Sequence, residues 1–313
     1  MMRKDLLSID DLSGEDIHLL ISNAVDMKAE GWLSSLTAKT LALIFEKPSL
    51  RTRVSFELAM KQLGGETIDL SPDEVGLGKR ESIPDIARVL ERYVDCIAAR
   101  TFSHQTLEIL SSYSRVPVIN ALSDLEHPCQ ALADLLTIYE KKGELKGLTL
   151  AFVGDGNNVA HSLLLAASLT GVNFRIASPS GYKVQDTILN LAQEHATNSG
   201  SEISSSEQPS MAVSGADIVY TDVWTSMGQE TESDQRRKTF ASYQVNNELL
   251  SLAKEDAILM HPLPAHHGEE VAEGILDSPQ SVVFDQAENR MHMQKALLAE
   301  MLGGLEIPLT GYR

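Results

Sequence analysis

Short apolar runs alternate with amphipathic stretches along most of the chain, and this alternation restricts the fold more than any other feature of the sequence. Short apolar runs of this length are typical of strands, and the stretches between them have helical spacing. A first helix is predicted at residues 13–29, where Ser13 can serve as the N-cap. The strands predicted in the first half are residues 41–45, 67–70, 95–99 and 117–119.

The pattern restarts after Gly143 and Gly147, which indicates a second domain. A chain of 313 residues exceeds the usual size of one hydrophobic core, so two domains are expected. We predict an α/β fold with two doubly wound parallel-sheet domains and a shared cleft, comprising residues 1–143 and 144–288. The helical segment at about 289–313 is expected to pack back on the first domain. The strands predicted in the second half are residues 148–153, 174–177, 218–221, 257–260 and 282–284, and the Ser-rich run 198–206 is predicted to be a surface loop.

The charge and cysteine content exclude several classes of protein. The 26 Lys and Arg residues and 44 Asp and Glu residues give a formal net charge of −18, which disfavours binding to nucleic acid or to an anionic membrane. The two cysteines are too few for a disulfide framework. The start of the sequence lacks the apolar core of a signal peptide, and no apolar run approaches the length of a membrane span. We therefore expect a cytoplasmic protein.

A basic segment, Lys47–Arg53, follows the first predicted strand and leads into a helix. Free N–H groups and the positive end of the helix dipole favour an anion at such a position, and the forked donors of arginine add to this preference. The alternative is a basic helix end on the surface, but there the helix dipole would oppose the arginines. We favour a phosphate site.

Two further groups follow predicted strands and are expected at the same edge of the sheet. Arg100 ends one strand, and His127-Pro128-Cys129-Gln130 follows the next. Taken alone, Arg100 is more often a surface charge and His127 more often a capping residue. Together with Arg51 they suggest a binding site.

The second half contains patterns that could indicate a cofactor or a metal. The turn Gly154–Asn158 follows a strand, but Val159 replaces the third glycine of a dinucleotide-binding turn and no acidic residue ends the next strand. His261, His266 and His267 lie on a loop interrupted by proline, which does not match a helical two-histidine motif. We therefore predict no cofactor and no metal.

Five motifs are spaced along the chain: Ser49-Leu50-Arg51-Thr52-Arg53, His127-Pro128-Cys129-Gln130, the Gly154–Asn158 turn, Asp222–Gly228 and His261–Pro264. These motifs resemble those of the carbamoyltransferase family, in its ornithine branch, and the resemblance covers essentially the whole chain. Arg290, in Glu288-Asn289-Arg290, resembles a late arginine of the same family.

The resemblance implies a carbamoyl phosphate-binding first domain, an ornithine-binding second domain, and transfer of the carbamoyl group to the side-chain amine of L-ornithine. Thr52, Arg100 and His127 would polarise the carbonyl group. The carbamoyl phosphate site implied by the family comprises Ser49, Leu50, Arg51, Thr52, Arg100, His127, Gln130, Arg290 and the carbonyl groups of Pro262 and Leu263. The implied ornithine site comprises Asn158, Asp222, Ser226 and Met227.

Three positions depart from the family pattern. Leu50 stands where a threonine is usual, Pro262 where the ornithine enzymes have a cysteine, and Gly76 where the family often has a glutamine. The alternatives are a carbamoyltransferase for putrescine, an acylated ornithine or aspartate, a non-catalytic anion-binding relative, and a nicotinamide dehydrogenase. Asp222 favours a cationic acceptor over aspartate. The family also implies a homotrimer or a multiple of trimers and a role in arginine biosynthesis.

Overall fold

The computed structural model describes residues 5–30, 36–71, 75–77, 80–225 and 230–303. The chain divides into two compact units, unit 1 (Met1–Leu136 and Asn289–Arg313) and unit 2 (Thr137–Glu288). In the described residues no helix is both long enough and apolar enough to cross a lipid bilayer.

Unit 1 is a four-stranded parallel sheet with helices on both faces. Its elements are η1 (Ile9–Asp11), α1 (Gly14–Glu30), β1 (Thr40–Phe45), α2 (Leu50–Gln62), β2 (Glu66–Leu70), α4 (Ile83–Leu90), β3 (Cys96–Arg100), α5 (His104–Tyr113), β4 (Val118–Leu122), the start of α6 (Pro128–Lys142) and most of α12 (Val283–Leu302).

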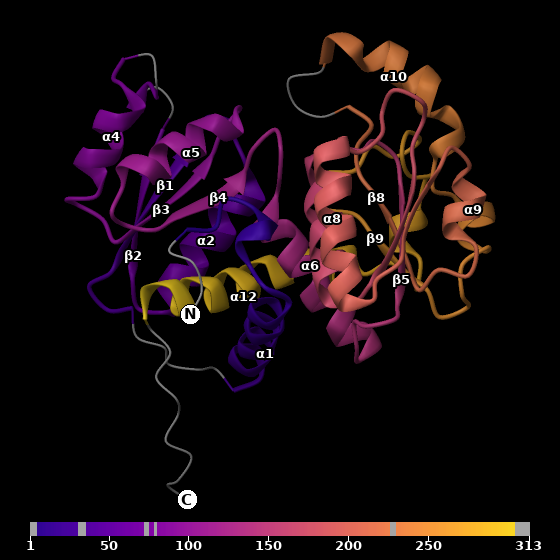
Figure 1. Cartoon of the computed structure of the whole chain (residues 1–313), viewed down its shortest axis with the longest axis horizontal. Helices are drawn as coiled ribbons and strands as arrows, with labels where there is room; N and C mark the ends of the chain where they lie inside the picture. Colours follow the sequence, from indigo (N-terminus) through magenta and orange to yellow (C-terminus); the bar gives the residue numbers. More distant parts are fainter. Residues whose placement is uncertain (1–4, 31–35, 72–74, 78–79, 226–229, 304–313) are drawn as a thin grey trace, which may run out of the picture. The chain divides into compact units, whose positions relative to one another are not determined.

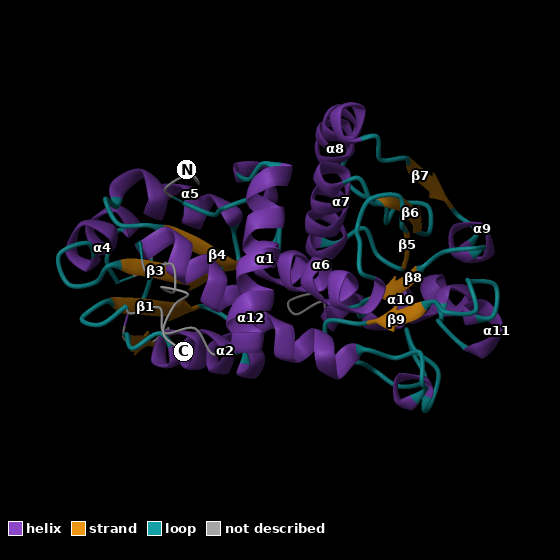
Figure 2. Cartoon of the chain, turned by 90° about the horizontal axis from the view of Figure 1, so that it is seen from below, coloured by secondary structure: helices purple, strands orange, loops and turns teal. Residues whose placement is uncertain are grey.

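The strand order of unit 1 is β2-β1-β3-β4, so the chain turns back between β1 and β3. Helices α4 and α5 cover one face of the sheet and α2 lies on the other, as Figures 1 and 2 show. Buried residues of α4, α5 and the strands form one apolar core, and α12 is joined to α2 by a Lys295–Gln62 hydrogen bond of 3.1 Å. The last helix therefore belongs to the same layer as α2.

Unit 2 is a five-stranded parallel sheet. Its elements are β5 (Thr149–Val153), α7 (Asn158–Thr170), β6 (Asn173–Ala177), α8 (Asp186–Ser199), β7 (Ile203–Ser206), α9 (Pro209–Val213), β8 (Ile218–Thr221), η2 (Glu230–Glu232), α10 (Ser233–Phe240), η3 (Ala241–Tyr243), α11 (Asn247–Leu250), β9 (Ile258–Met260) and η4 (Ile275–Asp277).

The strand order of unit 2 is β7-β6-β5-β8-β9, with the reversal between β5 and β8. Helices α7 and α8 lie on one face and α9 and α11 on the other (Figure 2). Every strand is parallel to its neighbours, so all carboxyl ends lie at one edge. The predicted fold class, two α/β domains with parallel sheets, is confirmed.

Two predicted elements of unit 2 were wrong. Residues 203–206 were assigned to a loop because they are rich in serine, but they form the edge strand β7, whose backbone pairs with β6 alone. Residues 282–284 were assigned to a strand because they are apolar and β-branched. Only a bridge between Leu259 and Ser281 forms there, and the chain enters α12 at Val283. In both places tertiary packing outweighed local propensity.

Candidate functional site

Polar side chains of unit 1 gather where the strand order reverses. Ligands of open parallel sheets bind at such a point, beyond the carboxyl ends of the strands. Phe45, the last residue of β1, is paired in register with Arg100, the last residue of β3. The segment that follows β1 therefore begins beside Arg100 and continues to the N-terminus of α2.

The N-terminus of α2 is capped by Ser49, whose hydroxyl accepts a hydrogen bond from the backbone N–H of Thr52. The same hydroxyl donates to the Thr52 hydroxyl at 2.9 Å. The Leu50 side chain is 75% exposed and turned outward, so this departure from the family motif leaves only a backbone N–H at that position. A helix start with free N–H groups next to arginines can hold an anion.

Three guanidinium groups converge on this helix start. Arg290 of α12 donates to the Thr52 hydroxyl at 2.7 Å. Burial lowers the pKa of Arg100 to about 10, with further contributions from the charges of Arg290 and Arg51. Burial also lowers the pKa of Arg51. Three cations held together in partly dry surroundings repel one another, and a bound anion would remove that repulsion.

Arg53, which belongs to the same sequence motif, lies outside this cluster. It is exposed and forms ion pairs with Glu57 at 2.9 Å and with Asp69 at 3.0 Å. Two carboxylates therefore account for its charge, and the sequence motif alone did not separate it from Arg51.

His127 and Gln130 lie at the start of α6, and both are buried. Burial lowers the pKa of His127 well below its ordinary value, and the charges of Arg290 and Arg100 lower it further. The imidazole is therefore neutral at physiological pH. Gln130 donates to Asp134 at 2.8 Å, while its buried side-chain oxygen accepts no hydrogen bond from the described residues.

The second polar group lies in unit 2, where β5 and β8 meet at their carboxyl ends. Asp222 directly follows β8 and is nearly buried. Asn157 donates to its carboxylate at 2.7 Å, and the backbone N–H of Val223 donates at 2.8 Å. Burial raises the pKa of Asp222, although His261 and Asn157 act in the opposite direction.

Sequence reasoning singled out Asn158 but missed its neighbour. Asn158 is the first residue of α7, whereas Asn157 is the N-cap and bonds both to Asp222 and to the helix start. An Asn before a helix is a general capping signal, so it did not mark a functional contact. Ser226 and Met227 lie outside the described residues.

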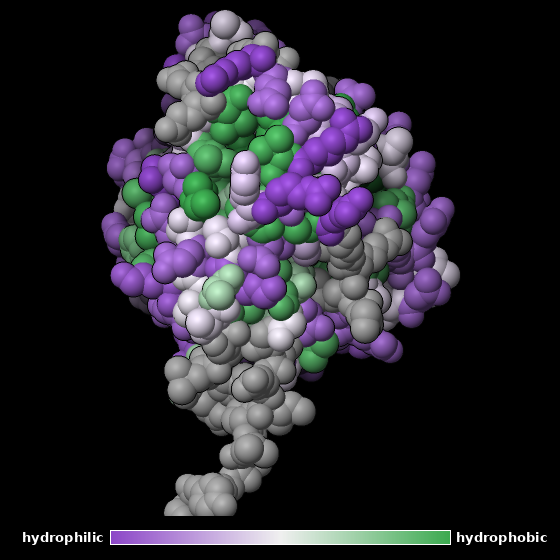
Figure 3. All heavy atoms as spheres, turned by 90° about the vertical axis from the view of Figure 1, so that its left-hand side faces the viewer, coloured by the Kyte–Doolittle hydropathy of each residue, from purple (hydrophilic) through white to green (hydrophobic). Residues whose placement is uncertain are grey.

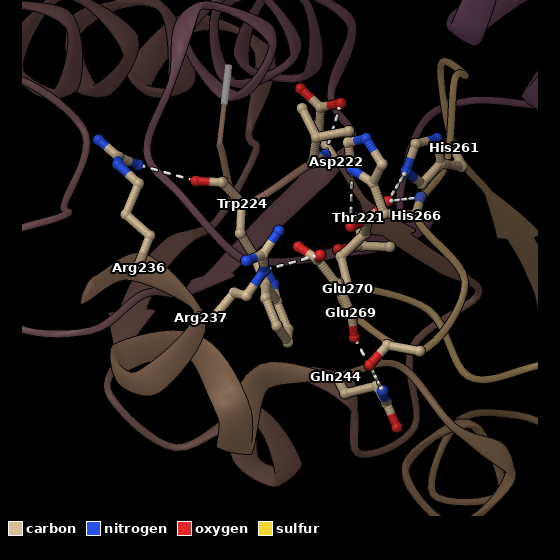
Figure 4. Close-up of polar contacts among 12 residues, drawn as sticks. Thr221, Asp222, Trp224, Arg236, Arg237, Gln244, His261, His266, Glu269 and Glu270 are labelled. Carbon is tan, nitrogen blue, oxygen red and sulfur yellow. Dashed lines mark hydrogen bonds and ion pairs between the residues drawn. The ribbon is translucent and has the colours of Figure 1, made fainter. Parts of the chain in front are cut away.

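The loop that follows β9 is fixed by a buried hydrogen bond between His261 and Glu270. His261 and Glu270 are both fully buried, and their side chains lie 3.2 Å apart (Figure 4). The other ring nitrogen of His261 accepts from the backbone N–H of Leu263, which has a positive φ of 55°. A leucine in this conformation is strained by about 1–2 kcal/mol, so these contacts hold the Pro262–Leu263 backbone in one shape.

Two arrangements bear on metals and cofactors. His266, Glu269 and Glu270 place potential ligand atoms within 4.8 Å of one another, but Arg237 pairs with Glu269 and the backbone N–H of His266 with Glu270 (Figure 4). A Cβ on Gly156 would come within 2.3 Å of the Val184 backbone. The chain itself thus occupies the space beside this turn, where a dinucleotide-binding turn would approach its ligand.

Comparisons with known proteins identify the family of the chain. The aspartate/ornithine carbamoyltransferase profiles match residues 4–140, described as the carbamoyl-P binding domain, and residues 146–301, described as the Asp/Orn binding domain. The chain belongs to the aspartate/ornithine carbamoyltransferase family.

Similar proteins share both sequence and fold over nearly the whole chain. The ornithine carbamoyltransferase of Hyperthermus butylicus is 55% identical over 305 residues, which cover 96% of this chain and 97% of the relative. The structure of ornithine carbamoyltransferase from Pyrococcus furiosus matches with a TM-score of 0.93 at 50% identity, covering 97% and 98% of the two chains. The enzyme from Gloeobacter violaceus matches with a TM-score of 0.89 at 47% identity, covering 96% and 99%.

Proposed function

We propose that this protein transfers the carbamoyl group of carbamoyl phosphate to the side-chain amine of L-ornithine and releases L-citrulline and phosphate. The observation that carries the proposal is the cluster of Arg51, Arg100 and Arg290 at the capped start of α2. The chain is also 50% and 55% identical to the ornithine carbamoyltransferases of Thermococcus kodakarensis and Hyperthermus butylicus. An acidic chain concentrates cations in this way where it must hold an anionic substrate.

The phosphate group is held at the start of α2. In this proposal it accepts hydrogen bonds from the backbone N–H groups of Ser49 and Leu50 and from the guanidinium groups of Arg51 and Arg100, while Arg290 closes the site from α12. The forked donors of arginine suit the oxygens of a phosphate better than a point charge would.

Thr52, Arg100 and His127 polarise the carbonyl group. A hydroxyl has two acceptor positions and one proton, and both acceptor positions of Thr52 are engaged by Arg290 and Ser49. The Thr52 proton is thereby directed to donate. Negative charge grows on the carbonyl oxygen as the amine attacks, and loss of one preplaced donor costs about 2.7–4 kcal/mol of transition-state stabilisation.

In this proposal the carbamoyl amino group donates to one side-chain oxygen and to two backbone carbonyl oxygens. The side-chain oxygen of Gln130 suits this role because its amide nitrogen is held by Asp134. The carbonyl groups of Pro262 and Leu263 are the other proposed acceptors, and a proline keeps its carbonyl group although it lacks the thiol usual at this position.

L-ornithine binds through the second polar group. Asp222 supplies the negative charge that a cationic amino acid requires, and Asn158, Ser226 and Met227 complete the proposed contacts. The attacking nitrogen forms a bond to the carbonyl carbon, and the bond between that carbon and the phosphate oxygen breaks with its electron pair leaving on the phosphate. The proton that the amine loses is taken up by the released phosphate. The negative charge of Asp222 disfavours aspartate as acceptor.

A homotrimer is proposed as the assembly, with unit 1 providing the contact surface. Leu50, Val54 and Leu58 form an exposed apolar stripe at helical spacing on α2. Hydrophobic side chains are also exposed on the side of unit 1 that carries α4 (Figure 3), where Leu70 and Val89 line a hollow. Apolar surface of this kind marks association sites. A trimeric mass in sedimentation supports the proposal, and a monomer at micromolar concentration contradicts it.

A biosynthetic role in arginine formation is proposed by analogy with the anabolic enzyme of Pyrococcus furiosus, which is 50% identical. Both cysteines, Cys96 and Cys129, are buried free thiols, which accords with a reducing cytoplasm.

The proposal is tested by citrulline formation from carbamoyl phosphate and L-ornithine with two arginine variants. Arg100→Met should lower turnover by orders of magnitude, whereas Arg53→Met, which removes an exposed arginine paired with Glu57 and Asp69, should stay near the wild-type rate. Equal rates for the two variants contradict the assigned anion site.

A further inference from the structure

We propose that Arg236 is a positioning residue for acceptor binding, which it organises through Asp155 and the backbone of Trp224 without touching the substrate. The inference rests on the proposed function, because the two segments that Arg236 joins carry the residues assigned to L-ornithine. All of the contacts involved lie within unit 2.

Arg236 occupies a buried position on the mostly polar helix α10 and is 6% exposed. One nitrogen of its guanidinium donates to the Asp155 carboxylate at 2.7 Å and to the carbonyl oxygen of Trp224 at 2.9 Å, and Figure 4 shows the second of these bonds. Its Nε donates to Glu232 at 3.1 Å. A single side chain thus joins the β5–α7 turn to the segment after β8.

Both joined segments carry proposed acceptor-binding residues. Asp155 lies in the turn that continues to Asn157, and Asn157 donates to Asp222. Trp224 lies two residues after Asp222 and two before Ser226. Arg236 therefore sets the spacing between the two strands' carboxyl ends at the point where a ligand of such a sheet binds.

The electrostatics favour a role in positioning over one in stability. The side chains of Arg236 and Asp155 are 7% and 10% exposed, so both charges have lost most of their water. Burial raises the pKa of Asp155 even though Arg236 opposes the change. A buried ion pair adds little net stability compared with apolar residues of similar size, whereas its geometry can specify one arrangement of the backbone.

The guanidinium shape itself is required. Arg236 lies over the ring of Tyr182, 4.9 Å from its centroid, and Trp224 stacks on Phe240 with centroids 6.0 Å apart. A planar group can pack on a ring while it donates to two acceptors, but an ammonium group cannot reproduce this geometry. Lysine should therefore fail to replace Arg236 even though it keeps the charge.

The test compares Arg236→Lys and Arg236→Gln with Arg237→Gln. Arg237 is the matched control, because it lies on the same helix but is 52% exposed and pairs with Glu269 and Asp234. We expect the Arg236 variants to raise the KM for L-ornithine by about 10- to 100-fold, as small misplacements do. The KM for carbamoyl phosphate should not change, and Arg237→Gln should resemble the wild type.

Hydrogen exchange of residues 222–225 provides a readout that does not depend on activity. Faster exchange in both Arg236 variants, with wild-type exchange in Arg237→Gln, supports the inference. Wild-type exchange together with an unchanged KM for L-ornithine overturns it, and so does an equal rise in both KM values. If the wild type used no amine, the proposed function would fail, while the exchange experiment would still decide whether Arg236 orders this segment.

Discussion

The guanidinium of Arg290 donates a hydrogen bond to the hydroxyl of Thr52 at 2.7 Å, between residues 238 positions apart in the chain. Helix α12 starts in unit 2 and returns to unit 1, where it brings this arginine to the start of α2. The bond occupies an acceptor position of the hydroxyl and so leaves the Thr52 proton to donate to a ligand.

Two replacements of Thr52 should distinguish the contribution of its hydroxyl to activity from that of its methyl group. Thr52→Val keeps the shape but removes the donor, so kcat should fall by about 10²–10³-fold, as for other donors to a developing oxyanion. Thr52→Ser keeps the hydroxyl and should retain most of the activity. Steady-state rates of citrulline formation measure both, and similar losses in the two variants would show that packing rather than the hydroxyl matters.

Phosphate should stabilise the protein through the arginine cluster. Arg51, Arg100 and Arg290 repel one another, and a bound anion reduces this repulsion in the folded state. At 100 times its Kd, an anion that binds only the folded protein should raise the free energy of unfolding by about 2.7 kcal/mol. Arg100→Met should lose this response, and without phosphate it should be at least as stable as the wild type, because a cation with a lowered pKa is disfavoured in the fold. Thermal unfolding with and without inorganic phosphate gives the comparison, and a full phosphate response in the variant would exclude the site.

His127 should not contribute an ionisation to the pH profile near neutrality. Its pKa is lowered by burial and by Arg290 and Arg100, so the ring stays neutral as the pH falls through the usual titration range of histidine. NMR of the imidazole nitrogens should show no protonation of this ring between about pH 6 and 8. A His127 pKa close to 6.5 would contradict the electrostatic description of the cluster.

The raised pKa of Asp222 should be detectable when the free energy of unfolding of the wild type is compared with that of Asp222→Asn at several pH values. Burial raises the folded-state pKa above that of the unfolded chain, so the native state binds more protons between the two values. The stability of the wild type relative to the variant should therefore decrease as the pH rises through that window and become constant above the folded pKa. Urea unfolding at several pH values measures the difference, and the opposite slope would show a lowered pKa.

Two arginines of the anion cluster could be predicted, because their positive charge stands out in an acidic chain and their positions directly follow predicted strands. In an acidic chain, the arginines of Lys47–Arg53 and Arg100 stood directly after apolar runs, and the structure brings Arg51 and Arg100 together. Arg53 could not be separated from Arg51 by sequence, since only the fold shows its ion pair with Asp69.

The supporting residues could not be predicted, because their patterns are common on surfaces. Arg236 lies in a charged helix beside Arg237, and nothing in the sequence distinguishes the buried arginine from the exposed one. Glu270 follows another glutamate, and its contact with His261 depends on how the loop folds. Edge strand β7 could not be predicted, because its side chains are mostly polar and its pairing with β6 is made by the backbone.

The central claim is tested most directly by turnover of purified protein with carbamoyl phosphate and four candidate acceptors, L-ornithine, putrescine, N-acetylornithine and L-aspartate. We expect turnover with L-ornithine, at a kcat/KM far above that for the other three, because similar proteins are ornithine carbamoyltransferases and Asp222 disfavours L-aspartate. Preferential turnover of another amine would contradict the assignment of ornithine while keeping the chemistry. No turnover with any of the four, in protein that still binds phosphate, would contradict the proposed activity itself.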